Sequence, residues 1–177
     1  SQLSPAAIES LTKDLFLLSE SRGKEAAGLS ILNGNTLQVL KRPIPASQFI
    51  RTKEFQTVFQ GLTNGGGSNA PMKTPVGIIG HSRLATNGTR DSHLNNQPVI
   101  AGGMVGIHNG IIVNDEALWK QFPELKRNSV LDTEVMLSLA RKFIESGDSI
   151  IEALQRVFTT VEGAASVAFL FEDYDCL

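Results

Sequence analysis

Apolar residues recur at helical spacing in the first third of the chain. Ser4-Pro5 is a helix-start signal, because proline fits the first helical position. The residues that follow predict a helix over 5–19, with apolar positions three or four apart at Ile8, Leu11, Leu15 and Leu18. A second helix is predicted over 47–59, where Phe55 and Phe59 share one face.

Two more helices are predicted in the second half. Asp132 opens a stretch with the same period, and we expect its inward positions to be Val135, Met136, Leu139, Phe143 and Ile144. Ser149 is followed three residues later by Glu152, which is the pattern of a capping box. This pattern predicts the start of another helix.

Short apolar runs bounded by glycine or polar residues predict the strands. Runs 28–32 and 36–40 flank Asn33-Gly34-Asn35, whose residues tolerate positive φ, so they predict a hairpin. Further strands are expected over 76–80, 98–101, 104–107 and 164–171, and the glycine-rich stretch 63–69 predicts a loop. Few connections are long enough for βαβ units. The pattern therefore predicts an α+β fold of antiparallel sheets covered by helices.

Composition narrows the class of protein. A chain of 177 residues with 41% hydrophobic and 19% charged residues predicts one globular domain over 1–177. A net charge of −2 without a basic stripe argues against nucleic acid, and the lack of a long apolar run argues against a membrane span. The single cysteine, Cys176, cannot form an intrachain disulfide. Without a signal-peptide pattern, we expect a cytoplasmic protein.

Four segments carry more glycine and polar residues than a core requires: 22–28, 80–88, 108–110 and 131–134. Arg83 at a strand end could bind a carboxylate bidentately, and Asp132 at a helix start could accept bonds from an ammonium group. Together they would fit an α-amino acid. The amide of Asn109 beside the N–H of Gly110 offers two donors for one oxyanion. This combination makes acyl transfer the natural reaction class.

Each feature also has a purely structural interpretation. Taken alone, Arg83 is most often a surface residue, Asn109-Gly110 a tight turn and Asp132 a helix cap. The glycines of 23–28 lack the terminal Gly-Lys-Ser/Thr of a phosphate loop. We expect no metal site, because the spacing matches no ligand pattern at His81, His93 and His108.

Taken together and in this order, these segments resemble the class II glutamine amidotransferases. The stretches that carry the resemblance are Arg22-Gly23 through Gly28 with Glu25 in the acidic place, Gly80-His81-Ser82-Arg83-Leu84-Ala85-Thr86-Asn87-Gly88, Asn95-Asn96-Gln97-Pro98, His108-Asn109-Gly110 through Asn114, and Asp132-Thr133-Glu134. They span roughly residues 8 to 171. Within the family, the sequence of these motifs is most similar to that of the glutaminase domain of glucosamine-6-phosphate synthase.

The resemblance implies a four-layer αββα sandwich and a nucleophilic cysteine at the mature N-terminus, whose α-amine acts as the base. It implies that Arg83 binds the glutamine α-carboxylate and Asp132 the α-ammonium. Backbone from Leu84 through Thr86 to Asn87 would shape the pocket, and Asn109 with Gly110 would form the oxyanion hole. No cofactor is implied. The implied partners are glutamine and a synthase or isomerase domain or subunit that receives the ammonia. The implied acceptor is a sugar phosphate, and the resemblance is compatible with a homo-oligomer.

The sequence departs from the family pattern at several places. Leu84 replaces the common Trp and Asn87 the common His, which affects pocket packing. No Cys-Gly-Ile is present, and neither Ser1 nor Cys176 stands where the nucleophile should be. We therefore expect a domain truncated at both ends, without its nucleophile strand and its last strands.

Two alternatives remain open from the sequence. The first is a nucleophile-less relative, a binding or regulatory domain that holds glutamine or a partner without hydrolysing it. The second is an unrelated α+β hydrolase, which is disfavoured because no Ser-centred elbow or metal motif is present.

Overall fold

A computed structural model describes residues 3–63, 67–70, 72, 74–84 and 96–173. The chain divides into two compact units, Ser1–Pro98 and Val99–Leu177, which are treated separately below. Over the described ranges, no helix combines the length and the apolar character needed to cross a bilayer.

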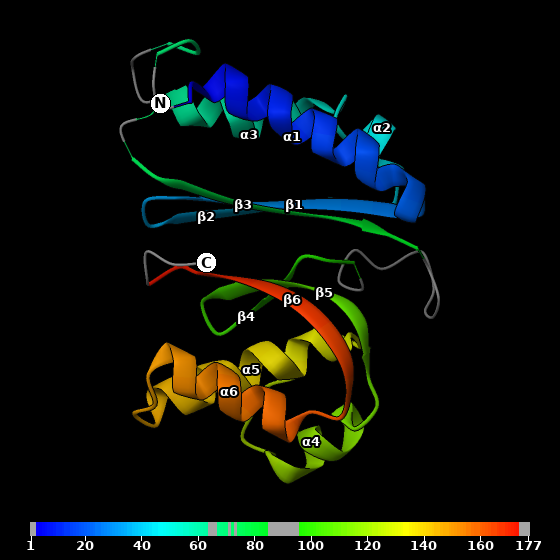
Figure 1. Cartoon of the computed structure of the whole chain (residues 1–177), viewed down its shortest axis with the longest axis vertical. Coiled ribbons are helices and arrows are strands. Elements are labelled where there is room, and N and C mark those ends of the chain that lie inside the picture. Colours follow the sequence, from blue (N-terminus) through cyan, green and yellow to red (C-terminus); the bar gives the residue numbers. More distant parts are fainter. Residues whose placement is uncertain (1–2, 64–66, 71, 73, 85–95, 174–177) are drawn as a thin grey trace. The chain divides into compact units, whose positions relative to one another are not determined.

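The first unit is one three-stranded antiparallel sheet with helices on one face (Figure 1). The strand order is β2-β1-β3; β1 pairs with β3 along its whole length and with β2 from Ala27 to Asn33. Its elements are α1 (Pro5–Ser19), η1 (Glu20–Arg22), β1 (Ala26–Asn33), β2 (Thr36–Arg42), α2 (Ala46–Phe49), α3 (Lys53–Gln60), η2 (Gly61–Thr63) and β3 (Val76–Arg83).

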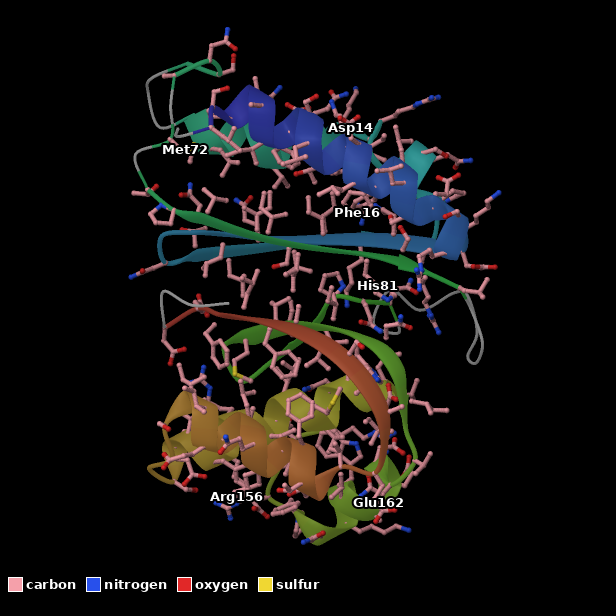
Figure 2. The ribbon with its side chains drawn as sticks, in the orientation of Figure 1. Asp14, Phe16, Met72, His81, Arg156 and Glu162 are labelled. Carbon is pink, nitrogen blue, oxygen red and sulfur yellow. The ribbon has the colours of Figure 1, made fainter. Side chains whose placement is uncertain are left out.

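Four phenylalanines join the helices of this unit into one core. The rings of Phe16, Phe49, Phe55 and Phe59 form four contacting pairs, with centroids 4.9 to 6.1 Å apart, and are almost fully buried. Phe16 reaches from α1 to the sheet (Figure 2), where a Cβ built on Gly80 would lie 2.9 Å from its ring. Glycine at this position lets α1 pack directly on β3, the strand that carries Arg83.

The predicted helix over 5–19 is confirmed, but its inward face is not the leucine stripe. Pro5, Thr12 and Phe16 are buried, whereas Leu11, Leu15 and Leu18 are 51%, 57% and 74% exposed. Ser4 caps this helix by accepting a hydrogen bond from the Ala7 N–H. The spacing therefore predicted the element correctly, while a large aromatic residue determined which face is buried.

The single helix predicted over 47–59 is wrong, because the structure has two short helices there. The break lies at Thr52, whose backbone is extended (φ −69°, ψ 150°) and whose hydroxyl oxygen accepts a bond from the Phe55 N–H. A threonine that caps a new helix competes with continuation of the previous one.

The second unit is another antiparallel sheet, of order β4-β5-β6, with α5 and α6 packed on one face (Figure 1). Its elements are β4 (Val99–Ala101), β5 (Met104–Ile112), α4 (Asp115–Gln121), α5 (Asp132–Glu145), α6 (Ile150–Thr160) and β6 (Gly163–Phe171). The core residues of α5 include Val135, Met136, Leu137, Leu139 and Phe143.

The α+β class with two antiparallel sheets is confirmed, and so is the capping box of Ser149 and Glu152. The strand predicted over 104–107 is too short, because β5 continues to Ile112. Helix α4 was not predicted, since its seven residues are too few to show a clear period. The four-layer αββα arrangement and the single domain over 1–177 stay predictions.

Candidate functional site

Arg83 is the last residue of β3, which confirms its predicted position at a strand end. Its Nη1 donates a hydrogen bond to Oδ1 of Asn96 at 2.8 Å. Asn96 is buried, with 3% of its surface exposed, and its main-chain carbonyl accepts a bond from Nζ of Lys41 at 2.8 Å. Arg83 is therefore attached to a side chain that is itself held in place.

The backbone at Arg83 is also fixed from the other side. The Glu25 N–H donates to the Arg83 carbonyl at 3.1 Å, which brings the 23–25 segment against the end of β3. A Cβ built on Gly23 would overlap the carbonyl group of Arg83 and the nitrogen of Leu84. The close approach therefore requires glycine at position 23. Leu84 follows the strand and is 59% exposed, while Thr86 and Asn87 lie outside the described residues.

Asn109 and Gly110 lie within β5, in register with Ser166 and Ala165 of β6. The interpretation of this pair as a tight turn is therefore wrong. The side chain of Asn109 is exposed, whereas His108, which points to the opposite face, is 3% exposed. The Asn109 amide and the His108 ring therefore lie on opposite faces of the sheet.

Gly110 has a backbone conformation that only glycine adopts readily, with φ at 147°. A Cβ built here would overlap the carbonyl oxygen of Ala164 on β6. Two independent constraints, the dihedral angle and the close strand partner, therefore require glycine. Neither of them comes from the side chain of Asn109.

Asp132 is the first residue of α5 and contacts β5 through both carboxylate oxygens. Oδ2 accepts the Ile112 N–H at 2.9 Å, and Oδ1 lies 3.4 Å from Nδ1 of His108. The helix cap position is occupied by Leu131, so the interpretation of Asp132 as a simple N-cap is wrong. Burial raises the pKa of Asp132, but the bonds from His108 and Ile112 outweigh it and leave this pKa below its ordinary value.

Glu134, two residues further along α5, holds the segment that leads into the helix. It is 1% exposed, and its two oxygens accept bonds from the N–H and side-chain amide of Asn128 and from the N–H and hydroxyl of Ser129. These four bonds satisfy a buried carboxylate that would otherwise be costly. Sequence reasoning gave no role to Glu134 or Asn96, since neither spacing nor composition shows which polar side chains become buried.

The described residues therefore offer three kinds of polar group. In the first unit, the Arg83 guanidinium suits a carboxylate. In the second unit, the Asp132 carboxylate suits an ammonium group, and the Asn109 amide can donate to a developing oxyanion. Within the described ranges, no group of three or more His, Cys, Asp or Glu side chains is placed to hold a metal ion.

A family model described as a glutamine amidotransferase domain matches residues 81–174. This range is more than half of the chain and includes Arg83, Asn109, Gly110 and Asp132.

Similar curated proteins carry the name glutamine–fructose-6-phosphate aminotransferase (isomerizing). The protein from Rhizobium leguminosarum bv. viciae is 39% identical over 106 residues, which are 59% of this chain and 17% of the relative. The proteins from Neisseria meningitidis and Staphylococcus aureus are each 31% identical, over 94% and 97% of this chain. The chain spans 25% and 26% of the length of those two relatives.

Two solved structures share the fold. The allosteric regulatory enzyme of purine biosynthesis matches with a TM-score of 0.69 at 22% identity, over 91% of this chain and 33% of that chain. The glutamine phosphoribosylpyrophosphate amidotransferase from B. subtilis matches with a TM-score of 0.61 at 25% identity, over 97% of this chain and 34% of that chain.

Proposed function

Because this chain belongs to the class II glutamine amidotransferase domain family, we propose that it is the glutaminase half of an amidotransferase. It would hydrolyse glutamine to glutamate and ammonia and supply the ammonia to an acceptor. The observation that carries this proposal is the attachment of Asp132 to β5. Its Oδ2 accepts the N–H of Ile112, two residues after Gly110 in the same strand. The Asp132 carboxylate is therefore held on the strand that carries Asn109 and Gly110.

Each group has one role in the proposed reaction. Arg83 binds the α-carboxylate of glutamine and Asp132 its α-ammonium, which places the side-chain amide of the substrate. A thiolate attacks the amide carbon, and the negative charge that develops on the oxygen is stabilised by the Asn109 amide and the Gly110 N–H. Leu84, which follows β3, forms part of the pocket wall.

The reaction then proceeds in two steps. Collapse of the tetrahedral intermediate breaks the C–N bond of the substrate amide. The α-amine of the N-terminal cysteine, which took the thiol proton, returns this proton to the leaving group, which departs as ammonia. This step leaves a glutamyl thioester, and water hydrolyses it to glutamate and regenerates the thiol. The family resemblance assigns the thiol to an N-terminal cysteine in a Cys-Gly-Ile stretch, and no such stretch occurs among residues 1–177.

The proposed acceptor is a sugar phosphate. Its support is the name of the similar curated proteins, which identifies fructose 6-phosphate as the substrate of those enzymes. In the same way, the proposed partner is a synthase or isomerase domain or subunit that uses the ammonia.

The full natural protein, with its own N-terminus, provides the test. Glutamate and ammonia release from glutamine should be measured with and without fructose 6-phosphate, and glutamine binding should be measured by calorimetry. We expect glutamate release in both cases and less free ammonia when the acceptor is present. Glutamate release with unchanged free ammonia would reject the sugar phosphate alone.

The alternative function gives a different result in the same experiment. Glutamine binding without any glutamate release would favour a binding or regulatory domain. Absence of both binding and release would contradict the glutaminase proposal and the glutamine site together.

A further inference from the structure

We propose that Asn96 is a positioning residue for the glutamine carboxylate site and orients the guanidinium of Arg83 through a clamp whose contacting atom is the neutral amide oxygen of Asn96. This inference rests on the proposed function, and it adds a residue to which neither the motif nor the family resemblance assigns a role. The clamp consists of Asn96, Lys41 and the backbone of 96–98.

The first step of the argument is the direct bond. Nη1 of Arg83 lies 2.8 Å from Oδ1 of Asn96, and Asn96 is 97% buried. A long arginine side chain at the end of a strand has many rotamers, and ordering it costs conformational entropy. A buried acceptor that selects one orientation before substrate arrives removes part of that cost from binding.

The second step is that Asn96 is itself fixed. Nζ of Lys41 donates to the Asn96 carbonyl at 2.8 Å, from the β2 position that pairs with Gly28 of β1. A Cβ built on Gly28 would overlap the Gln97 carbonyl oxygen and lie 2.6 Å from Cδ of Pro98. The absence of a side chain at Gly28 therefore lets the 96–98 segment lie directly on β1, and Lys41 holds its first residue.

The third step concerns charge. A carboxamide oxygen accepts a hydrogen bond from a guanidinium without adding a negative charge beside it. An aspartate in the same place would accept the same bond but would compete with the substrate carboxylate for the cation. A purely structural bond would tolerate aspartate, whereas a positioning role requires the neutral amide. This difference makes Asn96→Asp the decisive variant.

The experiment uses the full natural protein and compares Asn96→Ala, Asn96→Asp and Arg83→Ala. We expect Asn96→Ala to raise the KM for glutamine about tenfold with little change in kcat. Asn96→Asp should keep the melting temperature close to that of the wild type and raise KM more than alanine does. Because Asn96 acts through Arg83, the double variant Arg83→Ala/Asn96→Ala should have the same KM as Arg83→Ala alone.

A substrate analogue separates positioning from general damage. The compound 4-aminobutanamide is glutamine without its α-carboxylate, so its kcat/KM should be unchanged in both Asn96 variants. A folding defect would lower the rate with both compounds. The matched control is Asn33→Asp, the same substitution at the last residue of β1, away from Gly28 and the 96–98 segment. The Asn33 amide oxygen accepts a bond from the Thr74 hydroxyl. This control should leave KM for glutamine unchanged.

Two outcomes would overturn the inference, and they are distinct from failure of the proposed function. If the wild type turns over glutamine but Asn96→Asp has the wild-type KM, Asn96 has only a structural role. If the double variant is worse than Arg83→Ala by the full factor of the single Asn96 change, Asn96 does not act through Arg83. If the wild type neither binds nor hydrolyses glutamine, the glutaminase proposal fails first and the clamp has no substrate to serve.

Discussion

The two units hold their candidate groups by different means. In the first unit, Arg83 is oriented by the side chain of Asn96, and the position of Asn96 depends on Lys41. In the second unit, Asp132 accepts a main-chain N–H from β5, and Gly110 is defined by its own backbone conformation. The candidate carboxylate-binding group therefore depends on replaceable side chains. The candidate groups for the oxyanion and the ammonium depend largely on main-chain atoms of β5, with the His108 side chain as a second partner of Asp132.

This difference has an energetic meaning. A side-chain hydrogen bond can be removed with a limited loss of stability, because the surrounding backbone bonds persist. A backbone conformation cannot be changed without disturbing the strands that share it. We therefore expect changes in the first unit to affect substrate affinity and changes in the backbone of the second unit to affect folding.

The largest effect is expected for Gly110→Ala. Alanine at φ 147° would overlap the Ala164 carbonyl oxygen, so β5 and β6 could not keep their register. We expect a loss of more than about 4 kcal/mol in the free energy of unfolding, or failure to fold, measured by urea denaturation. The matched control is Gly34→Ala, where φ is 56° and no atom lies within 4 Å of the new Cβ. It should cost about 1 kcal/mol.

Asn109→Ala should have the second largest effect, on the rate. Its side chain is exposed, so its loss leaves the core intact. We expect kcat for glutamine hydrolysis to fall by about 10²–10³ in the full protein, with little change in melting temperature or glutamine binding. A residual rate is expected from the Gly110 N–H. An unchanged kcat per folded molecule together with a lower melting point would reject the oxyanion role.

Arg83→Ala should have a smaller effect than Asn109→Ala, and this effect should be on substrate binding. A bidentate guanidinium–carboxylate pair contributes about 1.5–3 kcal/mol, which corresponds to a KM about 10- to 150-fold higher. Arg83→Lys should not restore the wild-type KM, because an ammonium group lacks the planar pair of donors. Unchanged glutamine binding in calorimetry would show that another residue binds the carboxylate.

The smallest effect concerns pH and Asp132. The bonds from His108 and Ile112 keep its pKa below the ordinary value in the folded state. A carboxyl group with a lowered folded-state pKa stabilises the protein above its unfolded-state pKa of about 3.9, and this contribution is lost as the pH falls through the folded-state value. Asp132→Asn removes the ionisation. The wild type should therefore lose more stability than this variant between pH 5 and pH 3.

Urea midpoints at several pH values provide that measurement. The stability gap between the wild type and Asp132→Asn should be largest near neutral pH and should narrow below about pH 4. A gap of constant size would mean that the carboxylate has no role as a charged acceptor for Ile112.

Sequence reasoning predicted best the elements that have a local cause. The Asn33-Gly34-Asn35 turn and the Ser149–Glu152 capping box both act within a few residues, and both predictions were confirmed. The buried face of α1 could not be predicted in this way, because Leu11 and Phe16 are equally apolar in a periodic pattern. The glycine at position 80 and the ring contacts with Phe49 and Phe55 selected Phe16.

The same distinction applies to the candidate site. Arg83 at a strand end and Asp132 at a helix start were placed correctly, because each stands at the edge of an apolar run. The position of Asn109 within a strand was not predicted, since Asn-Gly is also the strongest short turn signal. Asn96 lies 13 residues after Arg83, and a contact of this kind depends on the path of the chain rather than on local pattern.

Side chains alternate between the two faces of β5, so the number of residues in this strand decides which face Asn109 occupies. The turn at Gly102 and Gly103 fixes where the strand begins, and the residues from Met104 onward are then directed to the two faces by parity. Deleting one residue between the turn and Asn109 would rotate the amide into the space that His108 now fills. Evolution can therefore lengthen the chain at the exposed turn around Gly34 far more easily than it can change the number of residues between Met104 and Asn109.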